Sequence, residues 1–345
     1  MRKSGFFFFV SLAAASLAGC GGSGSSGQPQ PPSEVFGSSE SGLVNGDLTT
    51  ARFSNPVNVA AAPDGTVYVC DFDNDAVRKI SPTGIVSTLT TQANFSTPFG
   101  IALTSTGRLF VETDRNDTGQ KDATTGTVWE INTTTGVPTV VARNLGRPRG
   151  LTALADGRLA CGDLGNSTVY LLDPATGAKT FLAGKTGTPG FANGNGVNAQ
   201  FDRPYGIAVM HDGSLLVADQ NNNRLRRVTL TGDVTTFAGT GAAGALNTAV
   251  ANATFNHPQG VTIAPNGTIY LTDNGNHLIR RISNGQVSTF AGNGVAGFAD
   301  GVGAAAEFFG IEGLNISPNG QTLWVADGNN GDGGPFNHVR RFATR

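Results

Sequence analysis

The amino-acid sequence predicts an all-β protein, a six-bladed β-propeller whose last blade is closed by a strand from the N-terminal side. The first observation is an internal repeat of six copies with a period of roughly 42 to 56 residues. The second is that each copy holds short apolar strand patterns separated by turns, without helical periodicity. Four-stranded units cannot bury their apolar faces alone, so the copies must stack. A radial stack leaves only short sheet edges exposed.

The first strand of each copy begins with a short motif, which reads Pro-X-Gly in the second to fifth copies. The six motifs are NPVNV (55–59), TPFGI (97–101), RPRGL (147–151), RPYGI (203–207), HPQGV (257–261) and GIEGL (310–314). A turn and a second apolar strand follow each motif, as in PDGTVYVCD and HDGSLLVAD. Third and fourth strand patterns come next, as in LRRV and GDVTTFAG. The repeat therefore predicts six blades of four strands.

The second strand ends on an acidic residue in five copies, and on Thr113 in the second copy. The five acids are Asp71, Asp163, Asp219, Asp273 and Asp327. We interpret them as scaffold residues, because a carboxylate at a strand end accepts hydrogen bonds from the turn backbone. Arginine pairs recur in the third strand at 226–227, 280–281 and 340–341. We expect these arginines to lie at the surface and to hydrogen-bond between blades.

The sixth copy supplies three strands and then the chain ends at Arg345. At the other end, EVFGSSESGLVNGDLTTARF (34–53) aligns with STFAGNGVAGFADGVGAAAEF (288–308), which contains the fourth strand of the fifth copy. The segment around Val35 and Phe36 is therefore predicted to be the outer strand of the sixth blade. This closure removes an unpaired edge that would promote aggregation.

Two copies in particular, PYGIAVMHDGSLLVADQNNNRLRRV (204–228) and PQGVTIAPNGTIYLTDNGNHLIRRI (258–282), resemble NHL repeats. The glycine-rich loops GTPGFANGNGVNAQF (187–201) and GVAGFADGVGAAAEF (294–308) are also similar to the connections of that family. The resemblance covers about residues 34–345 and implies a propeller of NHL-type repeats. The second and third copies depart most from the pattern.

The N-terminal residues predict export. Arg2 and Lys3 precede an apolar segment, 6–18, that is too short to span a bilayer. The segment ends at Leu17-Ala18-Gly19-Cys20, which resembles the lipobox of bacterial lipoprotein precursors. The resemblance implies a signal peptide over 1–19 and lipidation of Cys20; the alternative is an ordinary secretory signal with a chance cysteine. Residues 20–33, rich in Gly, Ser and Pro, form a predicted flexible tether.

These features predict a lipid-anchored protein of the cell envelope, on the outer membrane facing the periplasm or the surface if the host is Gram-negative. The net charge of −2 argues against a nucleic-acid partner, which requires a basic face. Cys70 and Cys161 lie within apolar strand patterns, so we expect buried free thiols in preference to a disulfide. A closed ring has no obligatory partner, and we expect a monomer.

The X position of the Pro-X-Gly motif is expected to lie at the mouth of the central channel. It varies from copy to copy, which is typical of a ligand surface, because packing alone would favour uniformity. The residues are Val57, Phe99, Arg149, Tyr205, Gln259 and Glu312. We predict that the last five bind a protein or saccharide ligand, with Arg149 offering a planar fork for an anion. The alternative is a variable, solvated loop position.

Three further departures from the repeat could form a metal site. Asn58 replaces the motif glycine of the first copy, and Glu112 replaces a small residue before the end of the second strand in the second copy. With Glu312 they provide two carboxylates and an amide oxygen, which suit Ca²⁺ or Mg²⁺. Propeller lactonases are similar in holding Ca²⁺ in the channel, but the likeness is at fold level only.

We therefore expect a membrane-anchored binding or scaffold propeller without a cofactor. The alternative is a Ca²⁺-dependent hydrolase, lactonase-like or esterase-like, in which the metal polarises a carbonyl group. The polar insertion RNDTGQKDATTG (115–126) in the second copy predicts a long hairpin; the alternative is a lid over the channel.

Overall fold

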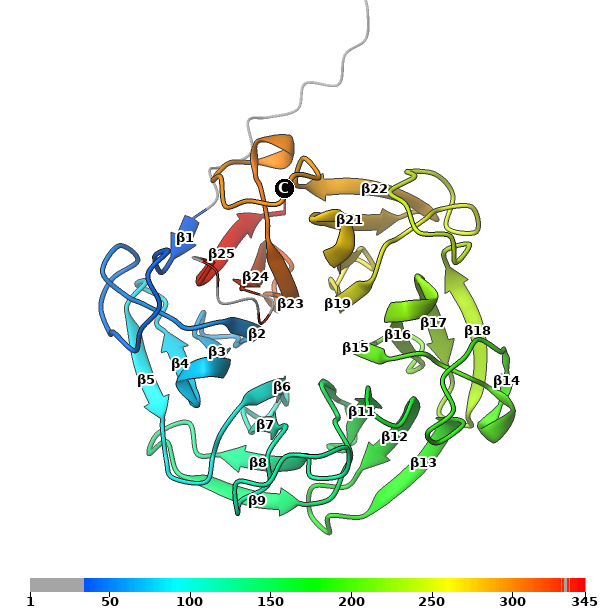
Figure 1. The fold of residues 1–345 in the computed structure, drawn as a ribbon, viewed down its shortest axis with the longest axis horizontal. Helices are drawn as coiled ribbons and strands as arrows, with labels where there is room; N and C mark the ends of the chain where they lie inside the picture. The colour runs from blue at the N-terminus through cyan, green and yellow to red at the C-terminus, as the bar shows by residue number, and fades with distance from the viewer. Residues whose placement is uncertain (1–33, 330, 332–333, 335, 345) are drawn as a thin grey trace, which may run out of the picture.

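The structure is a computed structural model that describes residues 34–329, 331, 334 and 336–344. The described residues form six antiparallel sheets arranged around a central channel (Figure 1). The predicted six-bladed β-propeller is thereby confirmed. The signal peptide, tether and lipidation predicted over residues 1–33, including Cys20, lie outside the described residues.

Each blade is numbered by the copy that supplies its first strand. Blade one contains β2 (Pro56–Ala61), β3 (Val67–Asp71), β4 (Ala76–Ile80) and β5 (Val86–Thr90). Blade two contains β6 (Pro98–Leu103), β7 (Leu109–Thr113), β8 (Thr127–Ile131) and β9 (Pro138–Ala142). Blade three contains β10 (Gly150–Ala153), β11 (Leu159–Asp163), β12 (Thr168–Leu172) and β13 (Lys179–Gly184).

The other three blades repeat this order. Blade four contains β15 (Pro204–Val209), β16 (Leu215–Asp219), β17 (Arg224–Val228) and β18 (Asp233–Ala238), with β14 (Gly194–Asn195) added at its outer edge. Blade five contains β19 (Pro258–Ile263), β20 (Ile269–Asp273), β21 (Leu278–Ser283) and β22 (Gln286–Ala291). Blade six contains β23 (Gly310–Ile316), β24 (Thr322–Gly328), β25 (His338–Ala343) and β1 (Glu34–Phe36).

Five short 3₁₀ turns complete the described elements. They are η1 (Phe72–Asn74), η2 (Gly196–Asn198), η3 (Gln220–Asn222), η4 (Asn274–Asn276) and η5 (Gly303–Ala305). Among the described residues, no helix has the length and apolar character needed to cross a membrane.

The N-terminal strand closes the ring as predicted. β1 pairs antiparallel with β25, with Phe36 opposite Val339 and Glu34 opposite Arg341. The Phe36 side chain is fully buried, and its ring centroid lies 5.5 Å from that of Trp324. Blade six is therefore completed by two ends of the chain, and the outer edge of β25 is paired.

The second strand of each blade is mostly apolar and buried, because neighbouring blades cover both of its faces. In β3, β7, β11, β16 and β20 every residue is buried. Cys70 and Cys161 lie in β3 and β11 and are both free and buried, as predicted. Burial raises the pKa of the Cys161 thiol above its ordinary value, which keeps it protonated and unreactive.

The acids at the ends of the second strands accept backbone hydrogen bonds as predicted, but they also form buried ion pairs. Asp71 accepts a hydrogen bond from the Ser54 amide at 2.7 Å and lies 3.0 Å from the Arg78 guanidinium. The same pairing joins Asp219 to Arg226 at 2.7 Å. It recurs in blades five and six as Asp273–Arg280 and Asp327–Arg340. All eight side chains are fully buried.

The prediction that the paired arginines lie at the surface is therefore wrong for the first arginine of each pair, namely Arg226, Arg280 and Arg340. Arg78 is the equivalent residue of blade one. It also donates to the carbonyl oxygens of Arg52 and Val44 and to the Asn45 amide oxygen, at 2.7–2.9 Å. These acceptors lie in the connection between blades six and one, which folds over the guanidinium. The second member, such as Arg227 or Arg281, is partly or fully exposed.

Blades two and three depart from this pattern because an aromatic residue replaces the buried arginine. In blade two, Trp129 Nε1 donates to Thr113 Oγ1 at 2.8 Å, so the Thr113 hydroxyl is the acceptor where other blades have a carboxylate. In blade three, the Tyr170 hydroxyl donates to the Leu145 carbonyl at 3.0 Å. Blade three thus keeps a hydrogen bond to its incoming connection, whereas the bond in blade two joins two strands of the same blade.

Candidate functional site

All six X positions of the Pro-X-Gly motif meet in one cavity of about 490 Å³ at the centre of the ring. The first strands begin at this end of the channel, and the second strands end there. We call it the mouth cavity. The structure therefore brings together the five residues predicted to bind a ligand: Phe99, Arg149, Tyr205, Gln259 and Glu312.

A second, narrower cavity of about 130 Å³ continues the channel beneath the mouth cavity. Four residues line both cavities: Phe99, Arg149, Tyr205 and Glu312. These four side chains consequently form the boundary between the wide mouth and the narrow part of the channel.

Arg149 is held in place by polar and aromatic contacts. Its Nη2 and Nε atoms donate to the two carboxylate oxygens of Asp114, at 2.8 and 3.4 Å. Its Nη1 donates to the Tyr205 hydroxyl at 3.3 Å, and its guanidinium lies 3.9 Å from the centroid of the Phe99 ring. The guanidinium fork is therefore fixed in orientation by partners on both sides.

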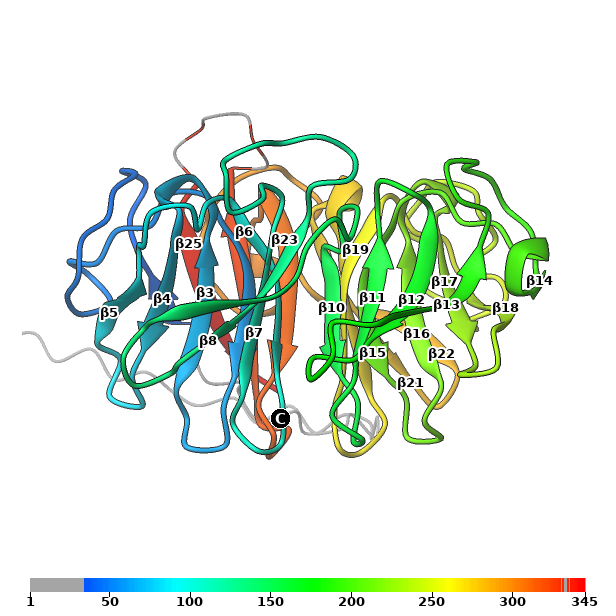
Figure 2. The ribbon, with the colours of Figure 1, turned by 90° about the horizontal axis from the view of Figure 1, so that it is seen from below.

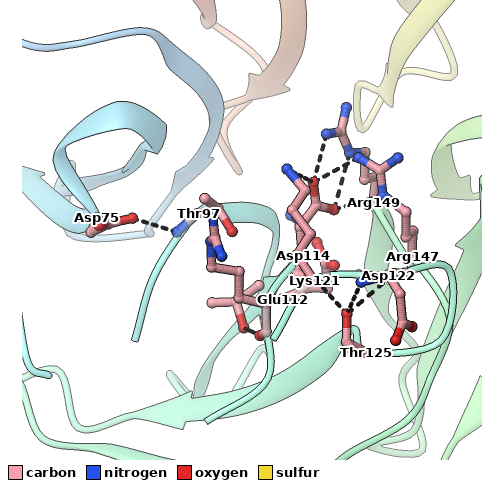
Figure 3. A network of polar contacts seen from close by, with 12 residues as sticks. Asp75, Thr97, Glu112, Asp114, Lys121, Asp122, Thr125, Arg147 and Arg149 are labelled. Atoms are coloured by element: carbon pink, nitrogen blue, oxygen red, sulfur yellow. Dashed lines mark hydrogen bonds and ion pairs between the residues drawn. The ribbon is translucent and has the colours of Figure 1, made fainter. Parts of the chain in front are cut away.

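Asp114 is the acidic centre of a cluster of cations beside the mouth (Figure 3). Besides Arg149, its carboxylate accepts a hydrogen bond from Arg147 at 2.7 Å and lies 3.5 Å from Lys121 Nζ. Burial alone would raise the pKa of Asp114, but Arg149 and Arg147 outweigh burial and hold the pKa below its usual range. Asp114 therefore stays ionised and is fully engaged by these cations.

Tyr205 and Glu312 form a buried pair across the channel. The Tyr205 hydroxyl donates a hydrogen bond to Glu312 Oε2. Burial raises the pKa of the Tyr205 hydroxyl well above its ordinary value, and Glu312 adds to the effect. Burial also raises the pKa of Glu312, although Arg149 and the Tyr205 hydrogen bond oppose this. The tyrosine is thus a permanent donor that occupies one oxygen of the carboxyl group.

The three residues predicted to hold a metal are only partly brought together. Asn58 and Glu312 both line the narrow cavity, whereas Glu112 lines neither of the two channel cavities. Glu112 Oε2 accepts a hydrogen bond from the Gly100 amide at 3.2 Å. Burial, with the nearby Asp114 charge, raises the pKa of Glu112. In the described part of the chain, no three His, Cys, Asp or Glu side chains are grouped as metal ligands. The Ca²⁺ site stays a prediction.

Sequence reasoning missed two further sets of residues that line the mouth cavity. One set stands directly after the end of the second strand and includes Phe72, Gln220 and Asn274. The other stands directly before the motif proline and includes Asn55, Arg203 and His257. Both sets vary between copies as much as the X position does, so the same signal could have found them.

The insertion in blade two reaches this site. It runs from β7 to β8 on the face that carries the mouth (Figure 2) and brings Lys121 to Asp114 and to within 5.7 Å of the Phe72 ring centroid. The backbone N–H of Asn116 donates to the backbone carbonyl of Gln120, and the backbone N–H of Gly119 donates to that of Asn116, as in a hairpin. The predicted long hairpin therefore also supplies a cation to the rim.

Comparisons with known proteins agree with this architecture. Residues 255–282, which span the first three strands of blade five, match the family model of the NHL repeat. The chain is 33% identical over 147 residues to NHL repeat-containing protein 2 of Bos taurus, which aligns with 39% of this chain. The chain covers only 17% and 20% of the lengths of the first two curated relatives, so it matches a part of each.

Solved structures show the same fold at low sequence identity. A protein of unknown function from Bacteroides thetaiotaomicron superposes with a TM-score of 0.71 at 22% identity, over 90% of this chain and 76% of that protein. A second protein of that organism, described as an auxiliary nutrient binding protein, gives a TM-score of 0.70 at 19% identity, over 91% and 76% of the two chains. The chain is thus a six-bladed propeller in which one repeat, residues 255–282, matches the NHL repeat model.

Proposed function

We propose that this protein is a binding propeller of the bacterial cell envelope, held by a lipid on Cys20, with its ligand in the mouth cavity. The observation that carries the proposal is the convergence of six variable repeat positions on one cavity of about 490 Å³. That volume lies within the range of small-molecule sites. The lining combines aromatic rings, amides and arginines, which suits a polar ligand such as a saccharide.

The position of the first described strand supports this arrangement. Glu34 pairs with Arg341, near the C-terminal end of β25. That end of β25 lies beside Thr322, where β24 begins. The mouth cavity lies at the opposite end of the strands. A tether attached at Glu34 would therefore be joined to the face opposite the mouth and leave the mouth cavity unobstructed. The description of a structural neighbour as a nutrient binding protein is consistent with this proposal.

Substituting the residues at the base of the mouth cavity tests the proposal. We expect Tyr205→Phe and Arg149→Lys to weaken binding by about ten-fold or more, because each removes a fixed donor from a buried site. Binding would be measured with an oligosaccharide array and by titration calorimetry on the detergent-solubilised full chain. Arg281→Gln, on the exposed face of blade five, is the matched control. Retained binding in both variants, with unchanged melting temperatures, would refute the proposed site.

The alternative function, a Ca²⁺-dependent hydrolase, has one supporting observation: Asn58 and Glu312 line the same narrow cavity. Elemental analysis of the purified chain separates the two functions. For the binding propeller we expect no stoichiometric metal and a melting temperature indifferent to chelator. One calcium per chain that disappears in Glu112→Gln would instead establish the metal site and call for an ester and lactone screen.

A further inference from the structure

We propose that the mouth cavity selects a carboxylate-bearing saccharide, one that contains uronic acid residues. The inference rests on the proposed binding function and names the chemical class of the ligand. It depends on three properties of the cavity: where its charges lie, which polar groups lack partners, and where its apolar surface lies.

The arginines of the mouth cavity come from consecutive blades. Arg149 belongs to blade three and Arg203 to blade four, and both line the cavity. Arg203 is exposed, and no described residue forms a hydrogen bond or a close ion pair with its guanidinium, although its charge acts on Glu312. Because an unpaired guanidinium presents a planar fork of donors, it is suited to a carboxylate group.

The acids near the cavity do not balance its arginines, because Glu312 interacts with both Arg149 and Arg203. Glu312 is the only carboxylate among the described lining residues, and one of its oxygens already accepts the Tyr205 hydrogen bond. Asp114 lies behind the lining and is taken by Arg147, Arg149 and Lys121. The lining therefore carries two arginines against one buried glutamate, and an anion is favoured over a neutral ligand or a cation.

The same cavity also needs hydrogen-bond donors from its ligand. Gln220 and Gln259 are 7% and 4% exposed, and the Oε1 atom of each has no partner among the described residues. A buried carbonyl oxygen without a donor is unfavourable, so both positions favour a ligand that supplies hydroxyl groups. A simple inorganic anion has few or no donors to offer, whereas a sugar acid provides a carboxylate and several hydroxyl groups together.

The remaining wall of the cavity is apolar. Blades one and two supply Val57, Phe72 and Phe99. Val57 and Phe99 are buried, so the partly exposed Phe72 ring, which lies edge to face with Phe99 at 5.9 Å, is the apolar surface open to a ligand. The C–H face of a pyranose ring packs on such a surface while its carboxylate and hydroxyl groups point to the opposite side. A uronic acid residue matches all three properties: an anionic group, several donors and an apolar face.

The test compares oligosaccharides that differ only in the carboxyl group. Oligogalacturonates and other uronic acid oligosaccharides, and the same compounds with their carboxyl groups reduced to alcohols, are presented to the full chain on an array and then by calorimetry. We expect the acidic members to bind about ten- to a hundred-fold more tightly than the reduced ones, as for one charge-assisted contact. Added salt should weaken the acidic members selectively.

The variant Arg203→Gln removes the charge alone. Because the side chain is exposed, we expect the variant to fold as the wild type does, and a melting curve checks this. We expect Arg203→Gln to abolish the preference for acidic members while binding of the reduced members is unchanged. Arg281→Gln should keep the preference.

Equal binding of acidic and reduced members by the wild type would overturn the inference and leave the binding function standing. Binding of acidic peptides with no oligosaccharide bound would overturn the ligand class. No binding of any of these probes at the mouth cavity would count against the binding function as well.

Discussion

At the residue scale, the most unusual group is the Glu112 carboxyl. It is fully buried, and its Oε1 atom has no partner among the described residues. Burial, followed by the charge of Asp114, raises its pKa from 4.5 to about 8. The folded protein therefore keeps a proton on Glu112 that the unfolded chain loses at a lower pH.

This difference predicts how stability depends on pH. Because the folded pKa is the higher one, the stabilising contribution of the protonated group is complete below the ordinary glutamate pKa. It is lost as the pH rises toward about 8. We expect Glu112→Gln, which cannot ionise, to reduce the fall in unfolding free energy between pH 5 and pH 8, measured by urea denaturation. Glu40→Gln, at an exposed side chain, should reproduce the wild-type profile. An unaltered profile in Glu112→Gln would show that the carboxyl group is not its source.

At the element scale, each regular blade is joined to its incoming connection by one buried arginine. In blade four, Arg226 pairs with Asp219 at 2.7 Å and donates to the Gln200 and Ala192 carbonyl oxygens. Burial raises the pKa of Asp219 to about 6, although Arg226 opposes it. The carboxylate thus depends on its partner to remain charged inside the protein.

Removal of that partner should be costly. We expect Arg226→Met to lower the free energy of unfolding by about 3–5 kcal/mol, because it leaves a buried carboxylate unpaired. The double variant Arg226→Met, Asp219→Asn should recover part of the loss in chemical denaturation. The adjacent Arg227→Met, whose side chain is 42% exposed, should cost less than about 1 kcal/mol. Equal losses for Arg226→Met and Arg227→Met would contradict the buried-pair interpretation.

At the scale of the whole molecule, the ring depends on a contact between the two ends of the described chain. β1 and β25 belong to segments separated by about the full length of the propeller, and their pairing completes blade six. Phe36 fills the core beside Trp324 and Val339, in a cluster that also includes residues of blade one. The closure therefore stabilises the boundary at which the ring would otherwise open.

Two changes test the closure. We expect deletion of residues 33–40 to lower the melting temperature by several degrees, because it exposes the edge of β25. Phe36→Ala should lower the free energy of unfolding by about 3–5 kcal/mol through the cavity that it leaves. Leu43→Ala, at a side chain of the same segment that is 45% exposed, serves as the control for both measurements. A melting temperature that does not respond to the deletion would show that the strand contributes nothing to closure.

The fold could be predicted at this scale because the repeat is visible in the order of residues along the chain. Six motifs give six blades, and the missing final strand of the sixth copy points to the segment at Val35 and Phe36. The mouth position of the X residues followed from the same alignment. The burial of Arg78, Arg226, Arg280 and Arg340 could not, because strand alternation does not show whether a connection will fold over a polar face.

The sequence by itself thus determined the fold class, the number of blades, the closing strand and the positions free to vary at the channel mouth. Only the tertiary structure decided which side chains act together there. Asp114, Arg149, Tyr205 and Glu312 come from four blades, and ring closure brings them into one network. The same closure places Arg203, Gln220 and Phe72 around one cavity. The physical reason is that strand patterns report local burial, whereas hydrogen bonds and charge balance depend on distances between residues far apart in the chain.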